Sequence, residues 1–304
     1  MKNKKILGTL SGIMTGICWS LSGVFAQFLF DSKGVQANWM IPIRLVAGGL
    51  ILLLYMLFTN REELFAVVKN KKDFIRTIIS GVFGTMLFQS TFFKAVEASN
   101  AGTATVLQYL APVFIMIYVC LRVKRLPNKV EVLSIVLAVG GVFLIATHGN
   151  INSLSMTPAG LAWGIACAFG MFTDTILPES LNKKYSAMAI MSWSFLFGGI
   201  AAMFVLRPWN YQVDVDFEVV GALAITVIMG CVTAYLLYRY AIKTIGPAKA
   251  SLFSSSELVS ATILSVLWLG TPITLIDLIG FAMILAVVFI LTMDKQEEAA
   301  DEAK

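Results

Sequence analysis

Ten long apolar runs divide the sequence, and each is about as long as a helix that crosses a bilayer. Such a helix needs roughly 20 apolar residues, because the hydrocarbon core is about 30 Å thick. The runs do not alternate between apolar and polar residues, so we predict helices and not the strands of a membrane barrel. The expected spans are residues 6–29, 36–58, 74–95, 101–121, 129–147, 158–178, 187–206, 217–240, 249–269 and 272–293.

The overall composition supports a membrane location. Of the 304 residues, 58% are hydrophobic and only 13% are charged, whereas a soluble domain carries about 25% charged residues. The net charge is +5, but the basic residues stand in short blocks between the apolar runs and not along one polar surface. For this reason we do not expect a nucleic-acid partner. We therefore expect a multi-pass protein of the plasma or inner membrane, with the lipid bilayer as its surroundings.

The basic blocks also predict the orientation of the chain. Loops on the cytoplasmic side of membrane proteins carry an excess of lysine and arginine. With the N-terminus inside and ten spans, nineteen of the 23 basic residues fall on the inner side, and only Lys33, Lys94 and Arg207 fall outside. This bias predicts that both termini are cytoplasmic.

The two halves of the sequence resemble each other. The pattern Gly12-x-x-x-Gly16-Ile17 recurs as Gly160-x-x-x-Gly164-Ile165, and Gly48-Gly49 recurs as Gly198-Gly199. Because each half holds five spans, an odd number, the second half must enter the membrane in the opposite sense. An inverted repeat of this kind suits alternating access around a shared site, although duplication could also give a symmetric scaffold without transport.

We accordingly divide the chain into a first repeat at residues 1–150 and a second repeat at 151–293. The remaining segment, 294–304, is charged and mostly acidic, and we expect it to be a disordered cytoplasmic tail.

Enzymatic chemistry finds no support in the sequence. His148 is the only histidine, and it lies at the outer end of the fifth expected span, so we expect neither a histidine-based metal cluster nor a serine–histidine relay. The four cysteines lie inside apolar runs without metal-ligand spacing, and no glycine-rich loop for ATP phosphates is present. We expect no cofactor and no bound metal, and secondary transport follows by elimination.

Several ordered features together resemble the drug/metabolite transporter superfamily, in particular its ten-helix EamA-type branch. They are the two five-span halves, the glycine-marked first helix of each half, Arg44 in the second span, and two segments, Leu107–Phe114 and Ser254–Leu258. The resemblance covers essentially the whole chain. It implies a carrier of amino acids, other small metabolites or toxic compounds, often working as an exporter.

Polar and aromatic side chains at helical spacing suggest a binding cavity between the spans. Amides, hydroxyls and aromatic rings that converge on one cavity could bind a small zwitterion, whereas hydrogen bonds between helices could explain each of them singly. The candidate substrate-binding residues are Trp19, Gln89, Phe92, Gln108, Tyr109, Trp163, Ser254 and Ser255.

Three charged residues lie within apolar runs and could couple transport to protons or anchor the fold. Glu257 is the strongest candidate proton site, with a helix–helix hydrogen bond as its alternative role. Asp174 could face the cavity or pair with Lys183 or Lys184 at the inner end of its helix. Arg44 could anchor the fold, extend to the outer surface, or bind a substrate carboxylate through two parallel hydrogen bonds.

The sequence thus predicts a secondary active transporter of small organic metabolites, an exporter of amino acids or related compounds. Within transport, the alternative is an exporter of lipophilic cations. Outside transport, the alternative is a membrane sensor or scaffold without turnover. Protons are the candidate coupling ion, and the substrate and the oligomeric state stay open.

Overall fold

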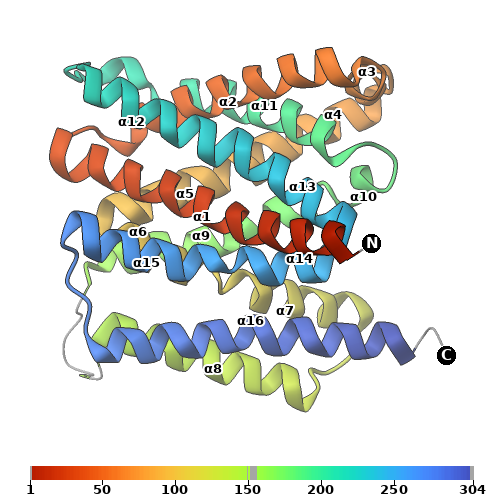
Figure 1. Ribbon diagram of the computed structural model, residues 1–304, viewed down its shortest axis with the longest axis vertical. Helices are drawn as coiled ribbons and strands as arrows, with labels where there is room; N and C mark the ends of the chain where they lie inside the picture. Colours follow the sequence, from red (N-terminus) through yellow and green to blue (C-terminus); the bar gives the residue numbers. More distant parts are fainter. Residues whose placement is uncertain (1, 149, 151–155, 302–304) are drawn as a thin grey trace.

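Helices are the only regular elements in the part of the chain that the structure describes, residues 2–148, 150 and 156–301 of this computed structural model. Figure 1 shows the long helices side by side, with the N- and C-terminal ends at the same face, which we call the terminal face. The elements are α1 (Lys2–Lys33), α2 (Ala37–Thr59), α3 (Arg61–Lys69), α4 (Lys71–Ser80), the π-helix η1 (Gly81–Met86), α5 (Leu87–Ala98), α6 (Ala101–Gln108), α7 (Ala111–Val123), α8 (Lys129–Thr147), α9 (Pro158–Ile176), α10 (Glu179–Asn182), α11 (Ala187–Leu206), the 3₁₀-helix η2 (Pro208–Asn210), α12 (Phe217–Val227), the π-helix η3 (Ile228–Thr233), α13 (Ala234–Ile245), α14 (Pro247–Ser254), α15 (Ser256–Leu269) and α16 (Leu275–Asp301).

Eight helical segments of the described chain are long and apolar enough to cross a membrane. They cover residues 4–33, 37–59, 101–123, 129–147, 158–182, 187–210, 217–245 and 249–269. Two further segments are helical: α4, η1 and α5 follow one another without a gap, and α16 contains a shorter apolar stretch, Leu275–Leu291. The expected all-helical membrane chain is therefore confirmed, and α16 continues past residue 293, where we expected the last span to end.

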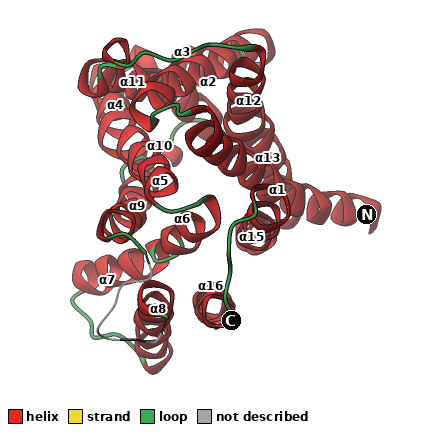
Figure 2. Ribbon diagram, turned by 90° about the vertical axis from the view of Figure 1, so that its left-hand side faces the viewer, coloured by secondary structure: helices red, strands yellow, loops and turns green. Residues whose placement is uncertain are grey.

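Helices from the two halves of the chain pack against each other in pairs. The most extensive associations are α2 with α11, α5 with α9, α8 with α16, and α1 with α13 and α15. Figure 2 shows α8 and α16 together at one edge of the bundle, and these two helices pack mainly on each other. The largest buried apolar cluster lies in the body formed by α1, α2, α5 and α11, and smaller clusters join α8 to α16.

Paired glycines let α2 and α11 approach closely. A Cβ on Gly49 would lie 2.6 Å from the backbone nitrogen of Leu196, and one on Gly199 would lie 2.7 Å from that of Val46. The contact is reciprocal, so the second glycine of each Gly-Gly pair fits against the partner's backbone, whereas Gly48 packs on Cys231 of η3 and Gly198 on Gly81 of η1. Small residues at such interfaces are typical of membrane helices, whose association depends on close packing.

Side chains at the helix ends explain where several helices begin. Asn128 accepts a hydrogen bond from the backbone N–H of Glu131 at 2.8 Å, and the Glu131 carboxylate accepts one from the Asn128 N–H at 2.7 Å. This capping box satisfies backbone donors that the first turn of α8 leaves without helical partners. Arg125 also binds the Glu131 carboxylate with two N–H groups, at 2.6 and 2.7 Å. Five other helices begin at a residue whose side chain accepts a hydrogen bond from a backbone N–H of the first turn: Asn60, Asn70, Asn100, Thr157 and Asp216.

Two of the expected spans are interrupted near their middle. The span expected at 101–121 is broken between α6 and α7, where Pro112 lies in the first turn of α7 and cannot donate a backbone hydrogen bond. The span expected at 249–269 is broken at Ser255, between α14 and α15. Both breaks lie beside polar side chains in the interior of the bundle, among them Gln108 and Ser254.

Candidate functional site

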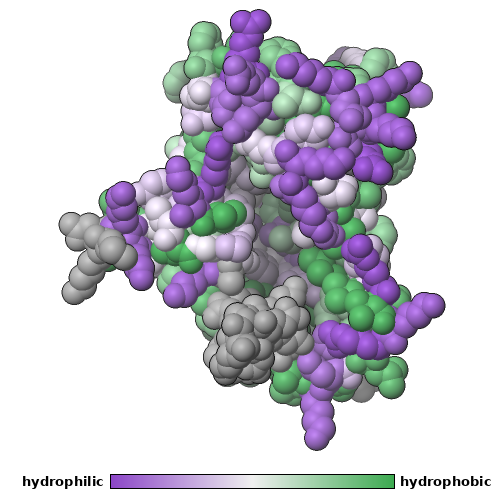
Figure 3. Space-filling view, turned by 90° about the vertical axis from the view of Figure 1, so that its right-hand side faces the viewer, coloured by the Kyte–Doolittle hydropathy of each residue, from purple (hydrophilic) through white to green (hydrophobic). Residues whose placement is uncertain are grey.

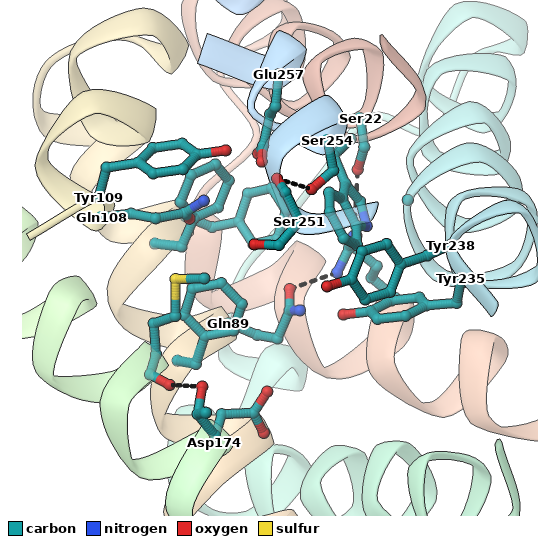
Figure 4. A pocket seen from close by; sticks show the side chains of 18 residues that line it. Ser22, Gln89, Gln108, Tyr109, Asp174, Tyr235, Tyr238, Ser251, Ser254 and Glu257 are labelled. Carbon is teal, nitrogen blue, oxygen red and sulfur yellow. Dashed lines mark hydrogen bonds between the residues drawn. The ribbon is translucent and has the colours of Figure 1, made fainter. Parts of the chain in front are cut away.

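A cavity of about 270 Å³ lies between the helices of the main body. Figure 4 shows its side chains converging from both halves of the chain. It is lined by Trp19, Ser22, Arg44, Phe88, Gln89, Phe92, Phe93, Gln108, Tyr109, Met171, Asp174, Thr175, Gly230, Tyr235, Tyr238, Ser251, Ser254 and Glu257.

Nine of the eleven residues singled out from the sequence line this cavity: Trp19, Arg44, Gln89, Phe92, Gln108, Tyr109, Asp174, Ser254 and Glu257. Trp163 and Ser255 do not line it. Trp163 is exposed, and its ring lies 4.7 Å from the ammonium group of Lys94. The Ser255 hydroxyl donates to the backbone carbonyl of Ser251 at 3.3 Å.

Arg44 is buried on α2 and is held by neutral partners. Its guanidinium donates to the Gln89 side-chain oxygen at 2.6 Å and to the Ser22 hydroxyl at 3.1 Å. The carbon atom of the guanidinium also lies 4.6 Å from the ring centroid of Phe93. Its side chain is 4% exposed, so Arg44 does not extend to the surface.

The guanidinium retains an unused hydrogen-bond donor. Its Nε atom is buried and has no hydrogen-bond partner, and no carboxylate of the described chain lies within ion-pair distance of Arg44. A charge in the middle of a membrane helix costs about 2.5–3.5 kcal/mol on insertion scales. An incoming anionic group would compensate this charge and accept from the guanidinium.

The two helix breaks bring Glu257 to the cavity opposite Gln108 and Tyr109. Gln108 ends α6, Tyr109 follows it in the break, and Glu257 stands in the first turn of α15. The Glu257 carboxyl is buried and interacts with the side chains of both residues. A continuous helix would turn these side chains to other faces, so the interruptions position them.

Asp174 lies across the cavity from Glu257 (Figure 4). It is half-buried near the end of α9 and accepts a hydrogen bond at 2.8 Å from Thr85, which belongs to the π-helix η1. The expected alternative, a pair with Lys183 or Lys184, is not formed: Lys183 pairs with Glu179 at 3.0 Å and Lys184 with Asp73 at 3.2 Å.

Aromatic rings that the sequence analysis did not single out complete the wall of the cavity. The ring centroid of Trp19 lies 5.5 Å from that of Tyr235 and 5.6 Å from that of Tyr238. The two tyrosines stand three residues apart and follow the π-helix η3, and Phe88 likewise follows η1. Their spacing puts Tyr235 and Tyr238 on one helix face, and that was the signal in the sequence that could have indicated them.

The cavity opens toward the terminal face. Thr175, at the end of α9, and Ser251, within α14, both line it and are exposed. Figure 3 shows this face with a hollow near its centre, between groups of hydrophilic side chains.

Toward the opposite face, a network around Gln27 closes the bundle. The Gln27 side chain is 3% exposed. Its oxygen accepts from the backbone N–H of Ala101 at 2.9 Å and from the Ser265 hydroxyl at 3.3 Å, and its nitrogen donates to the Thr271 hydroxyl at 3.2 Å. These bonds join α1 to the start of α6 and the end of α15.

An ion-pair cluster supports the same closure at the surface of the opposite face. Lys33 pairs with Asp216 at 2.8 Å and also with Glu218, which joins the end of α1 to the start of α12. Gln27 and Thr271 also line a separate pocket of about 500 Å³ on this face. That pocket shares no lining residue with the cavity around Arg44, so the two do not meet across the Gln27 network. No group of three or more potential metal ligands was found among the described residues.

Several known proteins similar to this chain are named as transporters. The EamA-like transporter family matches residues 6–147 and again residues 158–293. An uncharacterized inner membrane transporter of Salmonella typhimurium, YicL, is 34% identical over 96% of this chain and 97% of its own length. The uncharacterized transporter YyaM of Bacillus subtilis is 26% identical over 94% of this chain and 92% of its own.

A solved crystal structure shares the fold. It aligns with a TM-score of 0.64 and 14% sequence identity, covering 95% of this chain and 98% of the other. Together, the family match over both halves, the inner-membrane relative and the polar cavity within an apolar helical bundle lead to one conclusion. The chain belongs to the EamA-like transporter family and is a multi-pass transporter of the cell membrane, not an enzyme.

Proposed function

We propose that this transporter is a secondary active exporter of small zwitterionic metabolites, amino acids or related compounds, that works by alternating access. The observation that carries the proposal is the combination of a buried guanidinium, Arg44, with carboxyl groups, Glu257 and Asp174, in one cavity of about 270 Å³. A zwitterion can satisfy both kinds of group at once.

Arg44 is the proposed partner of the substrate carboxylate. Two of its donors already hold it in place through Gln89 and Ser22, while its Nε donor is unused. Charge-assisted hydrogen bonds to a carboxylate are roughly twice as strong as neutral ones. The substrate's ammonium group would then face Glu257 or Asp174, and its side chain would contact the aromatic wall.

We further propose ten spans in two inverted repeats, residues 1–150 and 151–293. The eight long apolar segments, the continuous run from Lys71 to Ala98 and the apolar part of α16 together supply ten crossings. The third and eighth of these crossings each contain a π-helix, and the fourth and ninth are each broken near their middle. The family also matches each half separately.

Equivalent packing contacts support the same repeat. A Cβ on Gly16 would meet the break between α14 and α15, at the backbone of Ser254 and Glu257, and a Cβ on Gly164 would meet Leu107, just before the break between α6 and α7. The glycine of each first helix therefore packs against the broken helix of the other half. Such an exchange of partners suits two repeats that rock around a shared site.

The terminal face is the proposed cytoplasmic face, because nineteen of the 23 basic residues belong to loops and ends on that side when the chain crosses ten times. The cavity then opens inward while Gln27 and Lys33 close the outside. This arrangement is the conformation in which an exporter takes up its substrate.

Protons are the proposed coupling ion. Glu257 and Asp174 are the carboxyl groups of the cavity, and neither pairs with a basic side chain of the described chain. A carboxyl group in such a site can take up and release a proton as its exposure changes between the inward-open and outward-open states.

Lipophilic cations are a second candidate substrate class. The cavity contains several aromatic rings, among them Trp19, Phe92 and Tyr235, beside two carboxyl groups, and cations bind favourably to aromatic faces. The buried charge of Arg44 favours a zwitterion over a cation.

Counterflow in proteoliposomes tests the proposal. Vesicles containing the purified chain are preloaded with a mixture of amino acids, and uptake of labelled amino acids is followed with and without an imposed pH gradient. We expect saturable exchange of one group of amino acids. Saturable flux of a lipophilic cation such as tetraphenylphosphonium, without amino-acid exchange, would move the assignment to the second class, and folded protein without any flux would favour a sensor or scaffold.

A further inference from the structure

Basic residues gather in a second pocket at the terminal face, far along the sequence from the residues around Arg44. This pocket has a volume of about 360 Å³ and lies between the end of α7 and the connection from α9 through α10. It is lined by Tyr118, Arg122, Ile176, Glu179, Ser180, Lys183 and Lys184. Figure 1 shows α10 and the end of α7 on the same side as the two termini.

The charges of this pocket do not balance. Three cationic side chains, Arg122, Lys183 and Lys184, share it with one carboxylate, Glu179. Glu179 lies 3.0 Å from Lys183 and 3.7 Å from Arg122, whereas Lys184 pairs with Asp73 outside the pocket. Because Arg122 and Lys183 share one partner and are mostly exposed, the pocket can accept a further anionic group.

A row of aromatic rings leads from the pocket along the bundle toward the membrane interior; we call Tyr118, Phe172, Phe114 and Phe169 the aromatic seam. The ring of Tyr118 on α7 lies 5.6 Å from that of Phe172 on α9, and Phe114 lies 6.2 Å from Phe169. Phe169 is 47% exposed. The neighbouring side chains of α7, Ile117 and Leu121, are also exposed. The seam therefore presents an apolar surface next to a cationic pocket.

From this juxtaposition we infer a binding site for one anionic phospholipid of the inner leaflet. The phosphodiester is held by Arg122 and Lys183, the Tyr118 and Ser180 hydroxyls donate to its oxygens, and an acyl chain follows the seam past Phe169. Basic pockets between membrane helices on the cytoplasmic side bind anionic head groups in this way. Arginine and lysine are both suited to phosphate, the first through paired donors and the second as a point charge.

The apolar seam favours a lipid over free phosphate. A soluble phosphate would gain only the contacts with the pocket, whereas a phospholipid also covers Phe169 and Ile117, which must in any case face acyl chains. The site lies at the end of α9, the helix that carries Asp174 to the transport cavity. The inference rests on the proposed cytoplasmic position of the terminal face and does not depend on the proposed substrate.

Native mass spectrometry of the full-length chain tests the site. The chain is purified in a neutral detergent and titrated with phosphatidylglycerol or with phosphatidylcholine as the zwitterionic comparison. The test variant combines Arg122→Gln with Lys183→Gln. The control combines Lys69→Gln with Lys72→Gln, which removes the same charge from exposed positions on the same side of the chain. Lys184 is left unchanged because it holds Asp73.

We expect the wild type and the control to retain one phosphatidylglycerol in preference to phosphatidylcholine. In the test variant we expect affinity for phosphatidylglycerol to fall roughly 10- to 30-fold, since each basic residue contributes to anionic-lipid attraction. Its thermal unfolding midpoint without lipid should match that of the wild type, because exposed ion pairs contribute little to stability.

Two results would overturn the inference. An equal loss in both double variants would show that overall charge and not the pocket attracts the lipid. Displacement of phosphatidylglycerol by sn-glycerol 3-phosphate at comparable concentration would show that the pocket recognises a soluble phosphate.

Discussion

At the scale of single residues, Arg44 distinguishes this cavity from an ordinary gap between helices. Its guanidinium is buried, held by Gln89 and Ser22, and left with an unused donor at Nε. A residue that only anchored the fold would gain stability from having every donor satisfied, because a buried polar group without a partner costs about 1–3 kcal/mol. The unused donor is consistent with a substrate that supplies the acceptor.

Replacing Arg44 with lysine keeps the charge but removes the planar fork of donors. Because a hydrogen bond to a charged group contributes about 1.5–3 kcal/mol, we expect the KM for exchange to rise roughly tenfold or more. The matched control is Arg239→Lys, since Arg239 is exposed on α13. If Arg44 only anchored the fold, less protein would fold but each folded molecule would exchange substrate at the wild-type KM.

Replacing Glu257 with glutamine removes a titratable group from the cavity and keeps its size. If Glu257 carries the coupling proton, the variant should lose flux driven by a pH gradient and retain substrate exchange, because exchange needs no net proton movement. Asp174→Asn provides the comparison within the same cavity. Undiminished pH-driven flux in the Glu257→Gln variant would remove Glu257 from the coupling mechanism.

At the scale of elements, interrupted helices bring polar groups to the interior. The break between α14 and α15 packs on Gly16 of α1, where a Cβ would lie 2.5 Å from the backbone nitrogen of Glu257. The glycine therefore fixes how close α1 lies to the segment that carries Glu257. The π-helices η1 and η3 also lie beside the cavity. Thr85 of η1 donates a hydrogen bond to Asp174, and Gly230 of η3 lines the cavity.

We expect Gly16→Ala to destabilise the chain by about 1–3 kcal/mol, as overpacking of a tight interior does. The control is Gly221→Ala, because a Cβ on Gly221 would meet no atom within 4 Å. Thermal unfolding of the purified variants in detergent measures both effects. Equal unfolding midpoints for Gly16→Ala and the wild type would contradict the close approach of α1 to this break.

Asp73, at the start of α4, contacts the segment that follows α10 through Tyr185 and Lys184. We expect this contact to weaken in acid. Asp73 lies just before the apolar run that begins at Phe74, and its carboxylate accepts from the Tyr185 hydroxyl at 2.9 Å and from Lys184 at 3.2 Å. The hydrogen bond from Tyr185, followed by the interactions with Lys184, holds the pKa of Asp73 below its ordinary value of 3.8.

A carboxylate whose pKa is lower in the folded state contributes stability that is present above its unfolded pKa and is lost as the pH falls through its folded pKa. We therefore expect the unfolding midpoint of the wild type to fall as the pH is lowered below about 4, in part because Asp73 becomes protonated. Asp73→Asn should start lower at neutral pH and lose less over the same interval. Parallel curves for the two proteins would rule out this contribution.

At the scale of the whole molecule, the sequence predicts the architecture better than the details of the site. Apolar runs show where helices lie because crossing a bilayer requires a fixed length, and the chain is helical in every expected span. Such runs do not show the π-helices or the breaks near Tyr109 and Ser255. These depend on packing between helices that are distant in the sequence.

The same limitation explains which site residues could be predicted. Gln108 and Glu257 stand out because polar groups inside apolar runs are costly and need partners. Trp163 was singled out as an aromatic residue within an apolar run, and it does not line the cavity. By the pairing of Gly12 with Gly160, the equivalent of Trp19 is Cys167, which is fully buried. The spacing of Tyr235 and Tyr238 puts them on one helix face, but they follow a π-helix, whose wider turn decides which neighbours that face meets.

The most direct test of the central claim is to block the cavity and measure transport. Ser251→Trp places a large ring where an exposed residue lines the cavity, and Val259→Trp places the same ring on an exposed position of α15 outside it. Both variants and the wild type are compared by counterflow in proteoliposomes. The account predicts saturable exchange by the wild type and by Val259→Trp, and little or none by Ser251→Trp. Exchange by Ser251→Trp at the wild-type rate would contradict the assignment of this cavity as the transport site.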